Sequence, residues 1–361
     1  MSPFYINAFL ILFIDALVFT FVKDDQKKRK YICLLNTLQI ILFIALRGET
    51  VGNDTQNYVN YFRQVASNPP IAFLKKEYEI GFRWYVYLIA KVTENPRVFL
   101  AIGAFVSFAP FGVLIYKYSK DCVLSFYTFC TMEFILFAMT GMRQNVAYLF
   151  VYSSYMLFQS DKKGTKIFSL ILIFVGGFFH KSAWAFIILY AMTFIKTAEM
   201  KKNIYVIGII CAFIFRNQIG RILVNSFYDA YMLNSTGAYS RVFMVGIVLT
   251  ICICFYNVIE VQSENDITYA DKVVLFPKLV DAMFLTTFLA VIALSISAAA
   301  RQARYFFVFI ILVLPELQYI IVKGQRRIFK MICYILLTLI MFYLFPHNGL
   351  CTSGYIFMWG G

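Results

Sequence analysis

Long apolar runs follow one another along most of this chain, and they limit what it can fold into. Runs such as 98–116, 122–140, 242–259 and 279–300 hold eighteen or more residues, close to the ~20 that a helix needs to cross the hydrocarbon core of a bilayer. Such helices satisfy their own backbone polar groups in lipid. With 61% hydrophobic and 14% charged residues, the chain does not have the composition of a soluble globular protein. We therefore expect an all-α integral membrane protein, a polytopic helical bundle of about ten to twelve transmembrane helices.

Only two polar intervals are long, 50–96 and 257–278. We therefore expect a single multi-pass transmembrane domain over residues 1–361, with one large external loop at 47–96. The first apolar run, 2–22, has no basic segment before it and no small-residue cleavage site. It is expected to be an uncleaved first span with its N-terminus outside.

The two kinds of positive charge separate across these expected spans. Of the 20 lysines, 16 fall in loops on one side, whereas 10 of the 13 arginines fall on the other. Short lysine-rich loops are typical of the cytoplasmic side and give the orientation. The net charge of +14 does not point to nucleic acid, because the lysines are scattered through short loops instead of forming one basic stripe.

Arginines on the outer side break the positive-inside pattern and need another reason. A guanidinium can hold a phosphate or carboxylate by two parallel hydrogen bonds, so an anion handled at the outer face would explain them. Arg47 begins the external loop, and Arg143 lies at the join of two spans. Arg301 and Arg304 are three residues apart, so on a helix they share one face. The alternative for each is an interfacial arginine that extends to water.

The run 167–195 has Gly176-Gly177 in its middle and His180 just after. Each half spans about fourteen residues, roughly 21 Å of helix, which is short of a core about 30 Å thick. A single long helix would put the basic loop 323–330 outside, so the positive-inside count favours a hairpin. His180 would then lie in a cavity open to the outside, where it suits a general base, although a structural histidine is the alternative.

Acidic side chains supply further candidates. Asp54 lies in a glycine- and asparagine-containing stretch suited to a tight turn, and Glu79 opens an aromatic-rich stretch, 79–91, that is expected to lie in the membrane interface. Four more acids lie inside apolar runs, where such groups are usually paired or functional: Asp15, Glu133, Asp281 and Glu316. The eight cysteines mostly lie in apolar runs without metal-binding spacing, so we expect neither a zinc site nor a disulfide framework.

Several short segments occur in an order that matches a known family. They are Arg47, Gly52-Asn53-Asp54-Thr55 with Tyr58, Glu79-x-Gly81-Phe82, Gly141-Met142-Arg143-Gln144, Phe179-His180-Lys181-Ser182-Ala183, and Arg301 to Tyr305. On these residues the chain resembles the EpsG-type branch of bacterial exopolysaccharide and O-antigen polymerases, which are Wzy-like proteins. Where that family often has Gly-Thr-Asp, this chain has Gly52-Asn53-Asp54, and after His180 the match is weak.

The resemblance implies a GT-C-like, multi-span glycosyltransferase of the bacterial plasma (inner) membrane. It would join undecaprenyl-diphosphate-linked oligosaccharide repeat units at the outer face, for O-antigen, capsule or exopolysaccharide, without a metal, a cofactor or a nucleotide sugar. A flippase and a chain-length regulator are expected partners, and nucleic acid is not. Arginines would stabilise the diphosphate that leaves, and a base would activate the acceptor hydroxyl. The diphosphate-binding candidates are Arg47, Arg143, Arg301 and Arg304, and the base candidates are His180 first, then Asp54 or Glu79.

Two other functions stay open at this point. A flippase for lipid-linked oligosaccharides would need ionisable groups along a path through the membrane, and Asp15, Asp281 and Glu316 leave that possible. An O-antigen ligase would share the outer arginines and the histidine. External aromatic side chains either stack on sugars or belong to the interfacial aromatic belt: Tyr58, Tyr78, Trp84, Tyr228, Tyr231 and Tyr239.

Overall fold

The computed structural model describes residues 2–74, 77–195, 197–227, 239–265, 274–347, 351 and 354–359. Within these residues the chain is almost wholly helical, and its one β-type contact is an isolated bridge between Arg47 and Phe357. The prediction of an all-α polytopic membrane protein is confirmed.

The chain divides into two compact units, Met1–Trp184 with Arg327–Gly361, and Ala185–Arg326. Each unit holds several apolar helices, so neither is a separate soluble part. The expectation of a single domain over 1–361 stays a prediction.

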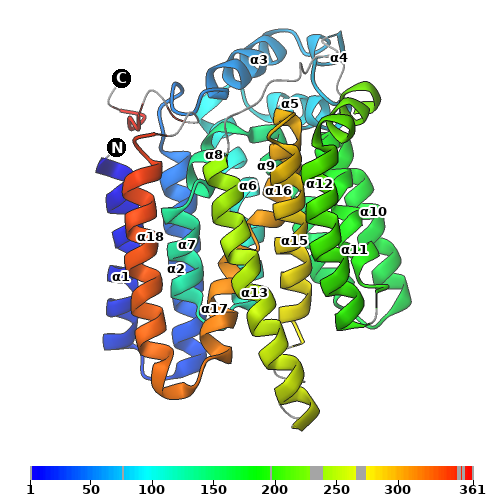
Figure 1. Cartoon of the computed structure of the whole chain (residues 1–361). Helices are drawn as coiled ribbons and strands as arrows, with labels where there is room; N and C mark the ends of the chain where they lie inside the picture. The colour runs from blue at the N-terminus through cyan, green and yellow to red at the C-terminus, as the bar shows by residue number, and fades with distance from the viewer. Residues whose placement is uncertain are drawn as a thin grey trace. The chain divides into compact units, whose positions relative to one another are not determined.

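The first unit is a bundle in which helices adjacent in sequence often pack together. α2 packs against α1 and α6, and α9 packs against α6 and α10. Figure 1 shows α3, α4 and α5 together at one end of this bundle. Its helices are α1 (Ser2–Phe21), α2 (Asp25–Ala45), α3 (Thr55–Ser67), α4 (Ile71–Leu74), α5 (Ile80–Val92), α6 (Pro96–Tyr118), α7 (Cys122–Thr131), α8 (Phe134–Thr140), α9 (Met142–Phe158), α10 (Lys163–Phe179) and α18 (Arg326–Leu344).

Three helices of this unit begin at residues that accept a hydrogen bond from a backbone N–H of the first turn. The carboxylate of Asp24 accepts from Lys27 N at 2.7 Å, the amide oxygen of Asn95 from Arg97 N at 2.9 Å, and the carboxylate of Asp121 from Leu124 N at 3.1 Å. Each cap satisfies a donor that has no partner within its own helix. These caps therefore set the starts of α2, α6 and α7 from local sequence alone.

Five helices of the described chain are long and apolar enough to cross a membrane, and two bent pairs raise this number to seven. The five are Pro3–Phe21, Pro96–Tyr118, Glu199–Ile222, Arg241–Ile259 and Lys323–Leu344. The larger number expected from the sequence also included shorter apolar segments. Three of these form helices of 17 residues each, α9, α10 and α15.

Two spans expected to be continuous are broken, and this corrects the boundaries expected from the apolar runs. The run 122–140 forms α7 and α8, which meet at an angle of 61°. At the break, Met132 has an extended backbone (φ −95°, ψ 176°). Within the run expected to cross at 279–300, α15 ends at Ile292. The next helix pair, Ser297–Phe307 and Ile310–Ile320, bends by 44°.

The helix in the run 167–195 breaks at His180 and not at the two glycines, and from there the chain turns back on α10 as far as Trp184. The hairpin expected over the whole run stays a prediction. α10 runs through Gly176-Gly177 and ends at Phe179, and His180 is extended (φ −156°, ψ 115°). Trp184 folds back so that its Nε1 donates to Phe174 O at 3.3 Å. It lies so close to Gly177 that a Cβ there would be 1.7 Å from Trp184 Nε1. The small residue at 177 therefore makes room for the reversal.

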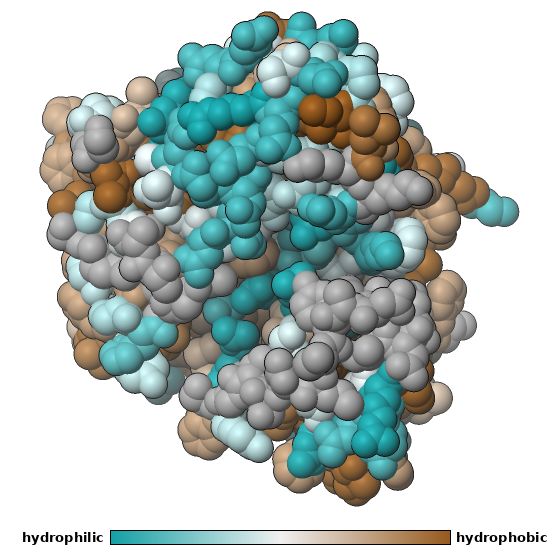
Figure 2. All heavy atoms as spheres, turned by 90° about the horizontal axis from the view of Figure 1, so that it is seen from above, coloured by the Kyte–Doolittle hydropathy of each residue, from teal (hydrophilic) through white to brown (hydrophobic). Residues whose placement is uncertain are grey.

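The expected external loop at 47–96 is largely helical, because α3, α4 and α5 form a small apolar core of their own. Phe62 and Phe82 are fully buried in it, and the Phe62 ring stacks on Phe99 of α6 at 4.6 Å. The opposite face of α5 exposes Trp84 (48%) and Leu88 (58%), as expected for a helix in the interface. Figure 2, looking onto the end where α3 to α5 lie, shows hydrophilic residues gathered over much of that face.

The second unit is arranged around α15, which packs against α11, α12, α13, α16 and α17. It holds a buried ion pair: Lys201 Nζ donates to Asp281 Oδ2 at 2.6 Å, and Tyr205 Oη donates to Asp281 Oδ1 at 2.6 Å. Lys201 is only 7% exposed. The helices are α11 (Ile187–Met192), α12 (Ala198–Phe227), α13 (Tyr239–Asn265), α15 (Phe276–Ile292), α16 (Ser297–Phe307) and α17 (Ile310–Ile320).

The Lys201–Asp281 pair gives a test of how α12 is held to α15. Replacing Asp281 by Leu leaves a buried cation without its partner, a loss of about 3–5 kcal/mol in folding free energy. The double variant Asp281→Leu with Lys201→Met removes both charges and should recover much of that loss. Melting of the three purified proteins in detergent measures this. Equal melting temperatures for the single and double variants would contradict the pairing.

Candidate functional site

Three side chains from distant parts of the sequence meet in the first unit around one carboxylate. Arg143 Nη1 donates to Glu79 Oε2 at 2.7 Å, and His180 Nδ1 lies 3.1 Å from Glu79 Oε1. The side chains are 23%, 13% and 9% exposed for Arg143, Glu79 and His180. Three residues chosen separately from the sequence therefore form one partly buried cluster, which we call the Glu79 cluster.

Helix ends position all three members of the Glu79 cluster. Glu79 is the extended residue just before α5, Arg143 lies in the first turn of α9, and His180 is the extended residue just after α10. α5 reaches the end of α10 because residue 81 is a glycine: a Cβ there would lie 2.8 Å from Phe178 O. Gly81 thus brings the carboxylate, two residues earlier, beside the histidine, two residues after Phe178.

Two tyrosines complete the surroundings of Arg143. Its Nε donates to Tyr58 Oη at 3.4 Å, and its guanidinium carbon lies 5.3 Å from the centre of the Tyr78 ring. The two rings are 6.1 Å apart, and Tyr58 also contacts Phe82 edge-on at 5.4 Å. From the sequence these tyrosines were expected either to stack on sugars or to belong to the interfacial aromatic belt. In the sequence, the signal that Tyr58 lies near Glu79 and Arg143 was the order of the family motifs, in which Tyr58 comes before both.

The electrostatics keep Glu79 ionised. Burial alone would raise the pKa of Glu79, but the hydrogen bond and charge of His180 and the charge of Arg143 outweigh it and lower the pKa to about 2. A carboxylate with so low a pKa is a weak base near neutral pH and a strong hydrogen-bond acceptor. When neutral His180 donates Nδ1–H to Glu79, its lone pair is on Nε2. The geometry therefore suits Glu79 to orienting the imidazole.

Asp54 lies at the exposed edge of this region. It precedes α3 by one residue and makes no capping hydrogen bond with its side chain. Burial raises the pKa of Tyr58, Arg143 lowers it, and the Asp54 charge adds a smaller upward shift. The same charge acts on Tyr78, so Asp54 lies close enough to the Glu79 cluster to influence it, while remaining open to solvent.

Arg47 lies in another environment of the first unit. It is 1% exposed, and its Nη1 donates to Ile44 O at 2.7 Å. The chain near the C-terminus covers it: Gly48 N donates to Ile356 O at 2.7 Å, and Met358 N donates to Leu46 O at 2.9 Å. The structure thus gives Arg47 no contact with Glu79, Arg143 or His180, and its role in binding diphosphate stays a prediction.

Arg301 and Arg304 belong to the second unit, where both lie on α16 and are partly buried. Their spacing places them on one face of that helix, as expected. Tyr228 and Tyr231, expected among the sugar-stacking aromatics, lie outside the described residues, and Tyr239 is the exposed first residue of α13.

A second network of charges near Arg47 was not expected from the sequence. Glu49 pairs with Arg63 at 2.7 Å and lies 3.9 Å from Arg97. Arg97 also donates to Arg47 O at 3.2 Å and to Met358 O at 3.4 Å. Arg97 therefore holds two backbone segments together. Among the described residues, no group of three His, Cys, Asp or Glu side chains could hold a metal ion.

These features define a class: a polytopic helical membrane protein with a partly buried carboxylate that joins an arginine to a histidine at the ends of its helices. The chain belongs to the EpsG family, whose model matches residues 30–357. That match includes every candidate site residue and confirms the resemblance seen in the motifs. No curated protein and no solved structure matches the chain. Membership of the family suggests an exopolysaccharide or O-antigen polymerase-like function.

The low pKa of Glu79 predicts a pH dependence of stability. Because the pKa of Glu79 is about 2 when folded and 4.5 in the reference state, its contribution is complete above about pH 5 and is lost as the pH falls towards 2. Glu79→Gln removes it, lowering the unfolding free energy at pH 6 by up to about 3 kcal/mol. The difference in melting temperature between wild type and variant should shrink from pH 6 to pH 3.

The matched control for this prediction is Glu77→Gln. Glu77 is two residues away on the same segment and is exposed, so its replacement should leave the melting curve nearly unchanged at both pH values. A difference between Glu79→Gln and wild type that stays constant from pH 6 to pH 3 would contradict the assignment of the ion pair to Glu79.

Proposed function

We propose that this protein is a polysaccharide polymerase that joins undecaprenyl-diphosphate-linked oligosaccharide repeat units at the outer face of the bacterial plasma membrane. The Glu79 cluster is the observation that carries the proposal. A base oriented by a carboxylate, with a guanidinium next to it, is what transfer of a sugar from a diphosphate to a hydroxyl requires. Family membership supports the same class of reaction.

In the proposed reaction, Nε2 of His180 accepts the proton of the acceptor hydroxyl as the hydroxyl oxygen bonds to the anomeric carbon of the donor sugar. The bond from that carbon to the diphosphate oxygen breaks, and its electron pair leaves with the diphosphate. Glu79 is a positioning residue in this scheme, because its carboxylate holds the Nδ1 side of the ring and its own pKa is about 2. Asp54, exposed at the edge of the site, is the second candidate for the base.

Arg143 is the residue best placed to meet the departing diphosphate. One arm of its guanidinium pairs with Glu79, Nε faces Tyr58, and one face lies over Tyr78. These contacts fix its orientation before substrate arrives, so little reorganisation is needed when negative charge develops. The roles of Arg301, Arg304 and Arg47 in binding diphosphate stay predictions, and Arg47 would require the residues that cover it to move.

Asp281 was one of the acids that left a transporter possible, and its contacts explain why a carboxylate is present there. Asp281 is 1% exposed and is satisfied by Lys201 and Tyr205, as expected for a buried charge that joins two helices. The polymerase therefore remains the function that these contacts favour.

The test replaces His180 or Arg143 by Ala in a bacterium whose own copy of the gene is deleted, and measures the length of the surface polysaccharide. Loss of a general base should reduce polymerisation by about 10²-fold or more, leaving single repeat units on the carrier. Lys181→Ala and Arg63→Ala are matched controls, because both are exposed cations near the same segments but outside the cluster. Both controls should retain long chains.

Other outcomes of this experiment identify the alternative functions. Unchanged chain length in both His180→Ala and Arg143→Ala would reject the catalytic assignment. Repeat units held on the cytoplasmic leaflet would indicate a flippase. Long chains that accumulate on the carrier without transfer to a final acceptor would indicate a ligase.

A further inference from the structure

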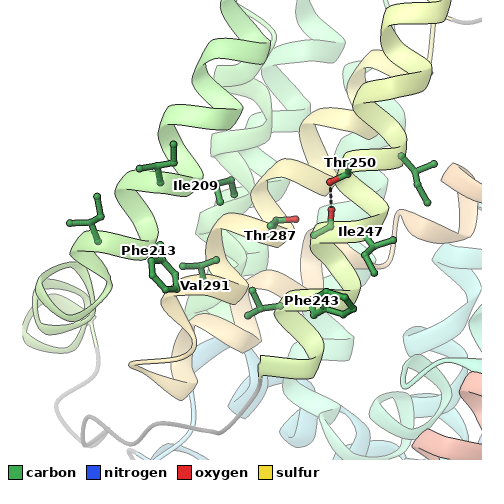
Figure 3. A pocket seen from close by; sticks show the side chains of 12 residues that line it. Ile209, Phe213, Phe243, Ile247, Thr250, Thr287 and Val291 are labelled. Carbon is green, nitrogen blue, oxygen red and sulfur yellow. Dashed lines mark hydrogen bonds between the residues drawn. The ribbon is translucent and has the colours of Figure 1, made fainter.

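The groove between α12 and α13 in the second unit, drawn in Figure 3, has a volume of about 660 Å³ and a mostly apolar lining. Thr250 Oγ1 donates to Gly246 O at 2.9 Å, and Thr287 Oγ1 donates to Met283 O at 2.9 Å. Such a lining, on two helices long and apolar enough to cross a membrane, is what contact with lipid chains requires. Polar contacts that have no assigned role lie instead in the first unit, around the loop that joins α2 to α3.

The α2–α3 loop, residues 46–54, leads directly into the Glu79 cluster. Its last residue is Asp54, the second candidate for the base. Tyr58, whose hydroxyl accepts from Arg143 Nε, follows in the first turn of α3. The position of this loop therefore affects where both side chains lie relative to Arg143.

The α2–α3 loop is held to one carbonyl at the end of α8. Thr55 is fully buried, and its Oγ1 donates to Met139 O at 2.8 Å. Gly52 has a left-handed backbone (φ 92°), and a Cβ at that position would collide with the same oxygen. The hydroxyl at 55 and the missing side chain at 52 thus allow the loop to approach Met139 closely.

This end of α8 is also fixed to the start of α9. Asn145 Nδ2, in α9, donates to two carbonyls of α8, those of Phe137 at 3.1 Å and Ala138 at 3.0 Å. These bonds tie the last turn of α8 to the first turn of α9, where Arg143 lies. The contact of Thr55 with α8 therefore links the position of α3 to the position of Arg143.

A segment near the C-terminus, residues 351 and 354–359, holds the α2–α3 loop as well, and we call it the C-terminal segment. Its backbone pairs with the loop at the bridge between Arg47 and Phe357. Tyr355 Oη donates to Phe43 O at 2.6 Å, and the two rings stack at 4.4 Å. The C-terminal segment is thus fastened both to the end of α2 and to the start of the loop.

Cys351 extends these contacts to α8. Its side chain is fully buried, and its thiol lies within hydrogen-bonding reach of the Thr140 hydroxyl and of the backbone of Gly52. Gly52 belongs to the α2–α3 loop, and Thr140 is the last residue of α8. Cys351 therefore lies at the same junction of loop and helix that Thr55 bridges.

We propose that Thr55 and Cys351 are positioning residues of the Glu79 cluster. Together they hold the α2–α3 loop against the end of α8, so that Tyr58 meets Arg143. Both act through the backbone of the loop and not through a substrate. Their effect on polymerisation rests on the proposed function, whereas their effect on the geometry of the cluster does not.

The first experiment measures coupling between Thr55 and Glu79 by thermal unfolding of the full-length protein in detergent. Thr55→Val keeps the shape of the side chain but removes its donor, whereas Thr55→Ser keeps the donor. If Thr55 positions the cluster, the fall in melting temperature caused by Glu79→Gln should be about half as large in the Thr55→Val background. In the Thr55→Ser background it should be unchanged.

Thr128→Val is the matched control for this measurement. Thr128 is also a fully buried threonine of the first unit, but its Oγ1 donates to Leu124 O within its own helix. Its effect should add to that of Glu79→Gln, as expected for independent sites. Cys351→Ala against Cys351→Ser repeats the comparison from the C-terminal segment, and decides the question if Thr55→Val does not fold.

The second experiment measures the length of the surface polysaccharide in the strain that lacks its own copy of the gene. Thr55→Val and Cys351→Ala should reduce polymerisation by about tenfold, because misplaced groups react slowly. The two serine variants should restore long chains at equal amounts of protein in the membrane, and Thr128→Val should retain them.

The two experiments separate the positioning role from the proposed function. Additive melting temperatures for Thr55→Val and Glu79→Gln would overturn the positioning role, and so would chains as short in Thr55→Ser as in Thr55→Val. Long chains in Thr55→Val, in a strain where His180→Ala abolishes them, would also overturn it. Coupled melting temperatures together with long chains in His180→Ala would support the positioning role and reject the proposed function.

Discussion

A carboxylate taken out of water has to be paired, and this requirement organises the first unit around Glu79. The side chain is 13% exposed and is shared between Arg143 at 2.7 Å and His180 at 3.1 Å. Without both partners the buried charge would cost several kcal/mol. Satisfying it forces the start of α5, the first turn of α9 and the end of α10 to converge. The same contacts that stabilise this arrangement orient the imidazole and the guanidinium on which the proposed chemistry depends.

Local sequence was sufficient to predict most single helices and each member of the Glu79 cluster. It did not predict that the members of the cluster contact one another. Asp24, Asn95 and Asp121 accept hydrogen bonds from the residues that follow them, so the helix starts depend on neighbours in the chain. Glu79 and His180 are 101 residues apart, and no periodicity relates residues so distant. Gly81 illustrates what the sequence could not supply. A glycine is needed there because α10 approaches closely, and that contact forms only in the tertiary structure. In the sequence the contact is marked only by one glycine within a family motif.

The breaks within spans were the least predictable part of the fold, again for a physical reason. An apolar run shows that a segment is buried in lipid or protein, and it carries no signal for a change of direction. Proline, the usual sign of a break, is misleading here, since Pro110 and Pro315 lie inside helices while α7 and α8 separate at Met132 and Glu133. A backbone that leaves the helix at membrane depth must find hydrogen-bond partners within the protein, and these partners depend on the surrounding helices.

The arginines that the sequence predicts on the outer side are not a single functional set. Arg63 and Arg97 pair with Glu49, and Arg97 also holds the chain near Met358 against Arg47. These contacts suit arginine, because its planar guanidinium can donate to several oxygens at once. They explain part of the excess of arginine on the predicted outer side without any ligand. Arg143 differs in its partners. It pairs with a carboxylate that also contacts a histidine, and two tyrosines fix the orientation of its guanidinium. The argument for anion chemistry therefore depends on which residues contact an arginine, and not on the number of arginines predicted on one side of the membrane.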